Sequence, residues 1–532
     1  MSLVEVDALT VEFGDLRAVD TLSFRLEEGA ALGIVGESGS GKSTVASALL
    51  GLHRGTGARV TGSVRIVGTD VQEADDEALR RLRGGTAAMV FQDPLSSLDP
   101  YYAVGDQIAE VYRVHSKASR RAARARAVEV LDRVGIPDAA RRARSRPHEF
   151  SGGMRQRALI AMALACEPAL LVADEPTTAL DVTVQAQILD LLHGLRQETG
   201  MGLILVTHDV GVAAESVDDV LVMRHGRAVE RGAVADVLGS PSATYTKELL
   251  GAVPRVDAPR LPRADISGDV LLEAVDLRRE FGRGKRAVAA VDGVSLAVRR
   301  GETLGIVGES GSGKTTLGRM LVGLLEPTSG QVRVPSGQLR VPGAHADAGV
   351  QMVFQDPVSS LNPRRSVGES VADPLRARGD KEVRGRVEEL LERVGLDPAH
   401  YGRYPHEFSG GQRQRVGIAR ALAAEPRIIV CDEAVSALDV TTQAQVTGLL
   451  RELQDELGLA LVFIAHDLAV VRQVSDRVAV MRKGRVVEHG TVDEVYGAPQ
   501  DPYTRQLLAA VPALDPAVAA RRRTARRELA AA

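Results

Sequence analysis

The sequence predicts an α/β fold that occurs twice along a chain of 532 residues. The first observation is a duplication: GIVGESGSGKST, which starts at Gly33, returns as GIVGESGSGKTT at Gly305. The second is that short apolar runs such as ALGIV, ALLVAD and GLILVT alternate with segments of helical pattern. Val, Ile and Leu runs without polar alternation are typical of strands buried on both faces of a parallel sheet, which helices must then cover.

The duplication extends along most of the chain. MVFQDPLSSLDP, with Gln92, returns as MVFQDPVSSLNP, with Gln355, and HEFSGGMRQR, with Ser151, returns as HEFSGGQRQR, with Ser409. The second copy is therefore 9 residues shorter before its glutamine and 5 residues shorter between the glutamine and the serine. Deletions of this kind belong in surface loops or in a peripheral subdomain.

Composition limits the class of protein. The chain has 66 Lys and Arg against 70 Asp and Glu, a net charge of −4, which argues against a protein that coats nucleic acid. Two cysteines, Cys166 and Cys431, are too few for a disulfide scaffold or a zinc module and are expected in the core. No apolar stretch is long enough to cross a bilayer, and the first residues do not resemble a secretory leader. We therefore expect a cytoplasmic globular protein.

The stretch from Gln92 to Arg146 is rich in Ala, Arg and Glu and contains no strand candidate, so we expect a helical subdomain there. A stretch rich in Pro and charge between the copies is expected to be a linker, and the Arg-rich end a solvated, frayed tail rather than a contact with anionic lipid. The expected boundaries are 1–251 for the first domain (helical subdomain about 93–150), 252–269 for the linker, 270–512 for the second domain (helical subdomain about 356–408) and 513–532 for the basic tail.

Two glycine-rich loops fit the phosphate-binding pattern G-x-x-x-x-G-K-[ST] (Walker A, or P-loop). They span Gly36 to Ser43 and Gly308 to Thr315, and each follows an apolar run of strand length. Glycine lets the backbone curl around phosphates with its N–H groups pointing inward. Lys42 and Lys314 place a cation beside the β- and γ-phosphates, and the hydroxyl residue after each lysine can bind Mg²⁺.

Two acid pairs, Asp174–Glu175 and Asp432–Glu433, end the apolar runs LLVADE and IIVCDE. The aspartates are expected to reach the metal, and the glutamates to orient or deprotonate an attacking water. His208 and His466 each follow their glutamate by 33 residues. A histidine at a strand end is often structural, but this fixed spacing favours a hydrogen bond to the γ-phosphate.

The order of P-loop, glutamine, SGG signature, acid pair and histidine resembles the nucleotide-binding domain of ATP-binding cassette (ABC) proteins, twice over the whole chain. The resemblance implies two tandem P-loop NTPase domains, each with a RecA-like core, an antiparallel β-subdomain and a helical subdomain. In that family the signature binds ATP held by the opposite domain, so Lys42 would share a site with Ser409, and Lys314 with Ser151. The aspartate of the D-loop, Asp181 or Asp439, crosses this interface.

The resemblance also implies that Phe13 and Phe281 stack on adenine, although a strand phenylalanine is often a core residue. The expected catalytic residues are Glu175, His208, Glu433 and His466. The expected metal ligands are Ser43, Gln92, Asp174, Thr315, Gln355 and Asp432. The expected ATP-binding residues are Phe13, Gly36, Ser38, Gly39, Ser40, Gly41, Lys42, Ser43, Thr44, Gln92, Ser151, Gly152, Gly153, Asp181, Phe281, Gly308, Ser310, Gly311, Ser312, Gly313, Lys314, Thr315, Thr316, Gln355, Ser409, Gly410, Gly411 and Asp439.

Two differences from the family pattern are visible. The first signature has Met154 where many members have glutamine, and the second acid pair continues Ala434-Val435-Ser436 where the first has Pro176-Thr177-Thr178. Neither difference removes a charged or phosphate-contacting residue, so both sites are expected to be competent.

QDPLSSLDP and QDPVSSLNP, with the endings TYTKELLGAVP and PYTRQLLAAVP, resemble the peptide/nickel group of ABC importers, and a fused pair is similar to glutathione-type importers. This implies an ATPase at the cytoplasmic face of the membrane that energises import of peptides or related solutes. The implied partners are two permease subunits, docked near the glutamine segments, and an extracytoplasmic binding protein.

Other functions stay open on the residues alone. A soluble tandem ABC ATPase that acts on ribosomes is the main alternative, although such proteins typically have a long charged helical linker. A DNA-repair ABC ATPase would need cysteine pairs that this chain lacks. The Arg-rich stretches 120–126 and 141–146 alternate with alanine and lack aromatic residues, so they favour a solvated helix face over nucleic-acid binding.

Overall fold

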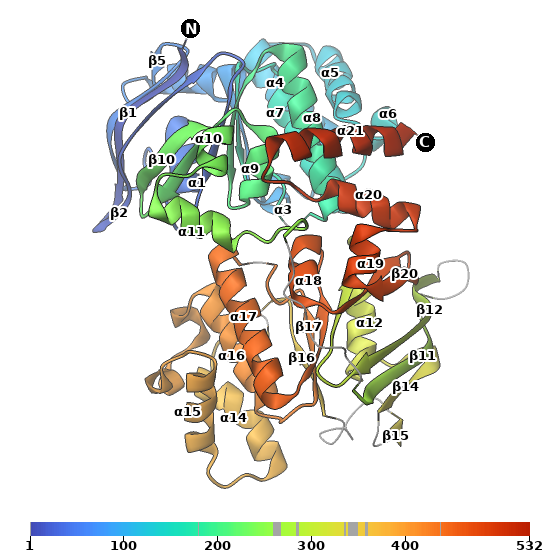
Figure 1. Ribbon diagram of the computed structural model, residues 1–532. Coiled ribbons are helices and arrows are strands. Elements are labelled where there is room, and N and C mark those ends of the chain that lie inside the picture. The colour runs from blue at the N-terminus through green and yellow to red at the C-terminus, as the bar shows by residue number, and fades with distance from the viewer. Residues whose placement is uncertain are drawn as a thin grey trace. The chain divides into compact units, whose positions relative to one another are not determined.

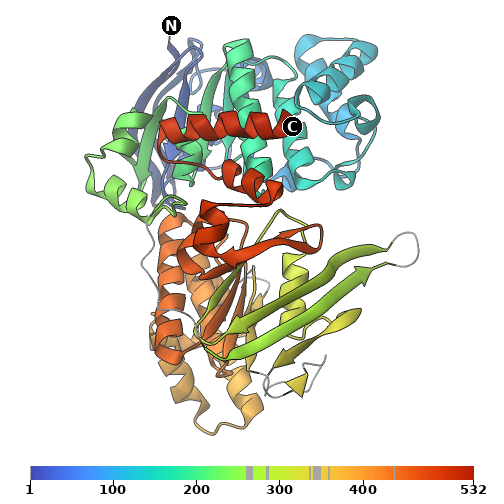
Figure 2. The same ribbon diagram turned by 45° about the vertical axis from the view of Figure 1, so that its right-hand side comes forward.

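The computed structural model (Figures 1 and 2) describes residues 2–178, 180–258, 268–282, 287–334, 337–338, 349–356, 360–436 and 438–531. The chain divides into two compact units. The first unit comprises Met1–Leu180, Val184–Val253 and Pro512–Ala532, and the second comprises Asp181–Thr183 and Pro254–Val511. The predicted linker, 252–269, includes residues 259–267, which lie outside the described residues.

The first unit is built on a six-stranded sheet with the order β10-β9-β3-β8-β7-β6. All neighbouring strands are parallel except β10 and β9. The strands are β3 (Ala31–Val35), β6 (Ala87–Val90), β7 (Leu170–Asp174), β8 (Gly202–Thr207), β9 (Asp219–Arg224) and β10 (Arg227–Ala233). The predicted parallel α/β sheet is therefore confirmed.

Both faces of this sheet are buried. Every residue of β3 is buried; Leu32 and Ile34 pack into one hydrophobic cluster, whereas Ala31 and Val35 pack into another. Alternate residues of a strand point to opposite faces, so an apolar run without polar alternation serves two cores at once. This explains the unbroken ALGIV pattern that precedes the P-loop.

An antiparallel sheet with the order β2-β1-β4-β5 adjoins the first core. Its strands are β1 (Ser2–Phe13), β2 (Leu16–Glu27), β4 (Arg59–Ile66) and β5 (Thr69–Asp70). The helices of this half are α1 (Lys42–Leu49), α2 (Asp76–Arg81), α3 (Pro94–Ser97), α4 (Val104–Ser116), α5 (Arg120–Arg133), α6 (Ala139–Arg142), α7 (Gly152–Leu164), α8 (Val182–Thr199), α9 (Val210–Ser216), α10 (Val234–Gly239) and α11 (Thr244–Ala252). Between Gln92 and Arg146 the described residues form helices and no strand, as predicted.

The second unit repeats this plan. Its main sheet has the order β16-β17-β18-β13-β19-β20, and its antiparallel sheet the order β12-β11-β14-β15. The strands are β11 (Val270–Phe281), β12 (Val288–Arg299), β13 (Thr303–Val307), β14 (Ser329–Val334), β15 (Gly337–Gln338), β16 (Val350–Val353), β17 (Ile428–Asp432), β18 (Ala460–Ile464), β19 (Arg477–Arg482) and β20 (Arg485–Thr491). The helices are α12 (Lys314–Leu321), α14 (Val367–Arg378), α15 (Val383–Arg393), α16 (Gly410–Leu422), α17 (Val440–Leu457), α18 (Leu468–Val474), α19 (Val492–Gly497) and α20 (Pro502–Ala510).

Two expectations need correction. The C-terminal end is not a frayed tail, because Pro516–Ala531 forms the helix α21, which packs on α9 of the first unit. Cys431 is fully buried, as predicted, but Cys166 is only half-buried. Among the described residues, no helix is both long enough and apolar enough to cross a membrane.

Candidate nucleotide-binding and hydrolysis sites

Each P-loop follows a fully buried strand and leads into a helix. In the first loop Gly36, Gly39 and Gly41 have φ angles of 154°, 77° and 98°, which L side chains rarely adopt. A Cβ at Gly36 would lie 2.3 Å from the carbonyl oxygen of Met223, and a Cβ at Gly41 would lie 2.3 Å from that of Ala18. The loop therefore requires glycine at these positions, and it leaves a concave backbone that suits an anion.

The lysine that begins each following helix is buried against its own loop. Lys42 Nζ donates to the carbonyl oxygens of Gly36 and Glu37, both at 2.8 Å. Lys314 Nζ donates to those of Gly308 and Glu309 at 2.7 and 2.8 Å. Burial lowers the pKa of Lys314. An ammonium group held by weak carbonyl acceptors inside a glycine loop is poised to bind a stronger, charged acceptor such as phosphate.

A buried hydroxyl supports this assignment. In the second loop the Oγ of Ser312 is buried and has no hydrogen-bond partner within the described part of the chain. A buried polar atom without a partner is costly, and in a native protein it commonly marks a place for a ligand or a water. The loop residues thus fit a bound phosphate group.

The hydroxyl residue after each lysine contacts the first acid of the acid pair. Ser43 Oγ donates to Asp174 Oδ1 at 3.0 Å, and Thr315 Oγ1 donates to Asp432 Oδ1 at 3.0 Å. Burial, reinforced by the charge of Glu175, raises the pKa of Asp174 to about 6. Burial also raises the pKa of Asp432. A hydroxyl and a carboxylate that are already in contact are ligands of the kind that Mg²⁺ prefers, so the residues fit a metal ion.

Glu175 is held by three side chains in the first unit. Gln92 Nε2 donates to its Oε2 at 2.7 Å, Thr178 Oγ1 donates to the same oxygen at 2.9 Å, and His208 Nδ1 lies 3.1 Å from its Oε1. Burial alone raises the pKa of Glu175, but the hydrogen bond and charge of His208 outweigh burial and lower it. Burial lowers the pKa of His208, but the hydrogen bond and the charge of Glu175 outweigh burial and raise it. Glu175 is therefore kept ionised, as a water-activating base requires.

The second unit repeats this cluster with differences in the histidine and hydroxyl contacts. Gln355 Nε2 donates to Glu433 Oε2 at 2.7 Å, and His466 Nδ1 lies 3.6 Å from the same oxygen. Ser436, which corresponds to Thr178, instead donates to the backbone carbonyl of Glu433 at 2.9 Å. Glu175 and Glu433 both have a φ of 47°, a strained backbone conformation of the kind that clusters at functional sites.

The signature serines cap helices. Ser151 Oγ accepts from the N–H of Met154 at the start of α7, and Ser409 Oγ accepts from that of Gln412 at the start of α16, both at 3.3 Å. Gln412 also accepts from the N–H of Ser409 at 3.0 Å, a bond that methionine cannot make. The signatures thus lie at helix N-termini.

The predicted D-loop aspartates and adenine-stacking phenylalanines lie as follows. Asp439 caps α17 by accepting from the N–H of Thr442 at 2.9 Å, and Asp181 accepts from Thr183 Oγ1 at 2.6 Å. Phe13 and Phe281 end strands of the antiparallel sheets and are 38% and 44% exposed. These phenylalanines are therefore surface residues rather than core residues. The ring of Phe13 meets that of His53 edge to face, with 5.4 Å between centroids, and the guanidinium of Arg279 lies 4.9 Å from the ring centroid of Phe281.

Sequence reasoning missed two tyrosines beside the P-loops. The N–H of Glu37 donates to Tyr245 Oη at 3.4 Å, and that of Glu309 donates to Tyr503 Oη at 3.0 Å. The repeated YT at the end of each half was a signal for them, but it was used only to assign a subgroup. The contact to Thr178 was missed because a threonine after an acid pair has no distinctive pattern.

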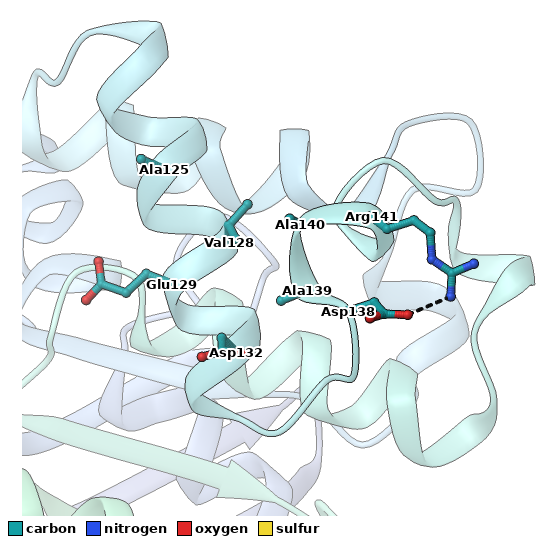
Figure 3. A pocket seen from close by; sticks show the side chains of 8 residues that line it. All are labelled: Ala125, Val128, Glu129, Asp132, Asp138, Ala139, Ala140 and Arg141. Carbon is teal, nitrogen blue, oxygen red and sulfur yellow. Dashed lines mark hydrogen bonds and ion pairs between the residues drawn. The ribbon is translucent and has the colours of Figure 1, made fainter.

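A pocket of about 650 Å³ lies elsewhere in the first unit, between α5 and α6. Its charged lining residues are Glu129, Asp132, Asp138 and Arg141, and an ion pair of 3.0 Å joins the last two (Figure 3). None of the predicted nucleotide-site residues lines this pocket, so we do not assign it to the nucleotide.

Comparisons with known proteins agree with this geometry. A family model described as ABC transporter matches residues 19–178 and 291–436. The chain belongs to the ABC transporter family. It is therefore an ATP-binding cassette ATPase with two cassettes, and a second model, the C-terminal region of oligopeptide/dipeptide transporters, matches residues 229–279 and 487–531. These matches support an importer ATPase over an ATPase that acts on ribosomes.

Relatives align over nearly the whole chain. It is 47% identical to the glutathione import ATP-binding protein GsiA of Salmonella choleraesuis, over 94% of this chain and 87% of the relative. The protein of the same name from Escherichia coli K12 is 46% identical over the same shares. Among solved structures, the cassette MJ0796 in a dimeric post-hydrolysis state with ADP and Pi is 31% identical, covers 42% of this chain and 99% of its own, and has a TM-score of 0.39.

Proposed function

We propose that the protein hydrolyses Mg²⁺-ATP at two sites and thereby drives import of a peptide-type solute, glutathione being one candidate, through separate permease subunits. The observation that carries the proposal is the cluster found in both units. In each, a hydroxyl after the P-loop lysine contacts one acid, and a glutamine contacts the other. The relatives named as glutathione import proteins support the solute class.

Some of these residues would bind the nucleotide, and others would carry out the hydrolysis. The glycine loop and Lys42 would hold the phosphates, and Ser43, Asp174 and Gln92 would hold Mg²⁺, with the matching residues in the second unit. The bound metal would supply neutralisation of the charge on the phosphates. Glu175 and Glu433 would accept a proton from the attacking water, while His208 and His466 keep each glutamate ionised and oriented.

The glutamine contact suggests how transport controls hydrolysis. Gln92 Nε2 and Gln355 Nε2 each hold one oxygen of the glutamate base at 2.7 Å, so the base is restrained while the contact lasts. Because the glutamine amide is neutral, moving it away from the carboxylate leaves no unpaired charge on the glutamine. We propose that permease movement turns the amide nitrogen away from the glutamate and frees the base, while the amide oxygen of the glutamine stays available to Mg²⁺.

The surface beside the glutamines supports docking of permeases there. In the second unit a groove of about 530 Å³ is lined by Phe354, which precedes Gln355, and by apolar residues such as Leu324 and Met352. In the first unit Phe91, which precedes Gln92, is 45% exposed. Farther along, the first unit displays exposed Tyr101 and Tyr102 where the second has Arg364 and Arg365. The two halves thus offer different surfaces, which fits two different permease subunits.

The proposal is tested by reconstituting the protein with its permeases and binding protein in vesicles and measuring uptake of labelled glutathione and dipeptides. We expect uptake that needs ATP and Mg²⁺ and that is lost in the double variant Lys42→Ala, Lys314→Ala. The control Lys247→Ala alters an exposed lysine of α11 and should transport normally. ATP hydrolysis without uptake of any tested solute would contradict the solute class, and absence of hydrolysis would contradict the whole proposal.

A further inference from the structure

The last helix of the chain belongs to the first unit, although it follows the second unit in sequence. α21 (Pro516–Ala531) packs on α9, and Ala519 is only 2% exposed. Both views show this helix lying across α8 and α9 (Figures 1 and 2). The second unit is thus inserted between two segments of the first, with joins at Val253–Pro254 and at Val511–Pro512.

Two acidic residues of the first unit form ion pairs with arginines of α21. Asp190 lies on α8 and Glu215 on α9, and together they form what we call the acidic socket. Arg526 Nη2 lies 3.0 Å from Asp190 Oδ1 and 3.6 Å from Glu215 Oε2. Arg523 Nε lies 3.6 Å from Asp190 Oδ1, and its Nη2 donates to the backbone carbonyl of Glu215.

These contacts are enclosed, unlike an ordinary surface ion pair. The side chains of Glu215 and Arg526 are 2% and 9% exposed. The backbone N–H of Ala513 also donates to Glu215 Oε1 at 3.3 Å, so the segment that leads into the helix is fixed as well. Breaking an enclosed pair leaves a buried charge without its partner, whereas breaking an exposed pair costs little.

The socket is a property of the first cassette alone. At the repeat spacing of 258 residues, Asp190 corresponds to Gly448 and Glu215 to Gln473. The duplicated helices of the second cassette therefore carry neither acid. The charge pattern directs α21 to the first cassette and not to the cassette from which the helix extends.

We infer that α21 is a clasp that holds the second cassette to the first without nucleotide, in addition to the covalent linker. A unit anchored at both of its ends explores a smaller volume than a unit anchored at one end, so the effective concentration of one cassette at the other rises. The clasp keeps the two cassettes paired when ATP leaves. The inference does not depend on which solute is imported.

The test cuts the full-length chain at engineered protease sites without altering the socket. One site is placed in the linker between Val253 and Asp269, and a second between Val511 and Pro512, outside α20 and α21, so that Ala513 and its contact with Glu215 stay with the first unit. After cleavage in ATP-free buffer at low protein concentration, gel filtration shows whether the pieces stay together. We expect the linker cut alone to leave them associated, and the two cuts together to release the second cassette.

Charge variants check that the socket is responsible. In the protein cut only at the linker, Arg523→Gln with Arg526→Gln should release the fragments, whereas Arg521→Gln, an exposed arginine of the same helix, should not. Separation of the wild-type fragments after the linker cut would overturn the inference. Continued association after both cuts would overturn it too, since other contacts would then hold the cassettes together.

Discussion

At the scale of single residues, the proposed chemistry depends on two carboxylates, those of Glu175 and Glu433. Glu175 and Glu433 each follow a buried strand, each has a positive φ, and each contacts a glutamine and a histidine. Glu175 has an additional hydrogen bond from Thr178 at 2.9 Å, which Ser436 does not give to the carboxylate of Glu433. The two bases are therefore alike in chemistry but differ in how firmly they are held.

Removing these bases should stop hydrolysis but preserve ATP binding. Glutamine keeps the size of glutamate but cannot accept the proton, and general-base assistance is typically worth about 10²–10⁴ in rate. We expect the double variant Glu175→Gln, Glu433→Gln to lose hydrolysis by about that factor and still bind ATP. If the sites work independently, each single variant retains roughly half the rate, and if they are coupled both fall further. A silent Glu433→Gln beside an inactive Glu175→Gln would show that the second site is degenerate.

Sequence patterns predicted most of the residues of the two sites but not which side chains contact each other. The P-loop, acid pair and histidine were predicted from local motifs, and their side chains do lie together in each unit. The partner of Gln92 was not predictable, because its amide contacts a glutamate 83 positions away. A contact of that kind depends on how β6 and β7 align in the sheet, which a linear pattern does not reveal.

At the scale of elements, the buried parallel strands and the helical stretch after Gln92 followed from the sequence, and the C-terminal helix did not. Unbroken apolar runs in the sequence predict buried parallel strands. In contrast, α21 is rich in arginine and alanine, and the partners that order it are far away in sequence: Arg526 pairs with Asp190, 336 positions earlier. A basic stretch is a solvated end only when the fold brings no acid to it, so the prediction of a frayed tail was wrong.

The socket should make stability depend on pH in a defined direction. Burial raises the pKa of Glu215 to about 7, although Arg526 and Arg523 oppose the shift, and Asp190 adds to it. His193 on α8 also faces this cluster, 3.4 Å from Arg523 Nη1. Between the ordinary glutamate value and about pH 7, the folded protein thus holds a proton that the unfolded chain releases. Stability therefore falls as pH rises through this window.

The check is the melting temperature at pH 5 and pH 7.5. A pKa shift of this size changes the free energy of unfolding by up to about 3 kcal/mol. We expect the melting temperature of the wild type to fall from pH 5 to pH 7.5. In Glu215→Gln this fall should be smaller by several degrees. Glu248→Gln, which alters an exposed residue of α11, is the control and should follow the wild type. Equal pH dependence in Glu215→Gln and the wild type would contradict the role of this carboxyl.

For the whole molecule, the duplication together with membership of the ABC family implies two ATP sites, each made from both cassettes. Each unit carries a complete P-loop and a complete signature, and the signatures lie at the N-termini of α7 and α16, where backbone N–H groups and the helix dipole favour an anion. We propose that each signature binds ATP held by the other cassette. This proposal is the centre of the account, because a transporter ATPase needs ATP binding to change how its two halves associate.

Disulfide crosslinking tests this proposal most directly. Cysteines are placed at Ser40 and Ser409 in the Glu175→Gln, Glu433→Gln background, which retains ATP. Burial raises the pKa of both native thiols, to about 12 for Cys431, so they compete poorly. The control pair, Ser40→Cys with Ser151→Cys, joins residues of one cassette. The account predicts that ATP increases crosslinking of the Ser40–Ser409 pair and not of the control pair. Equal crosslinking with and without ATP, or an increase only in the control pair, would contradict it.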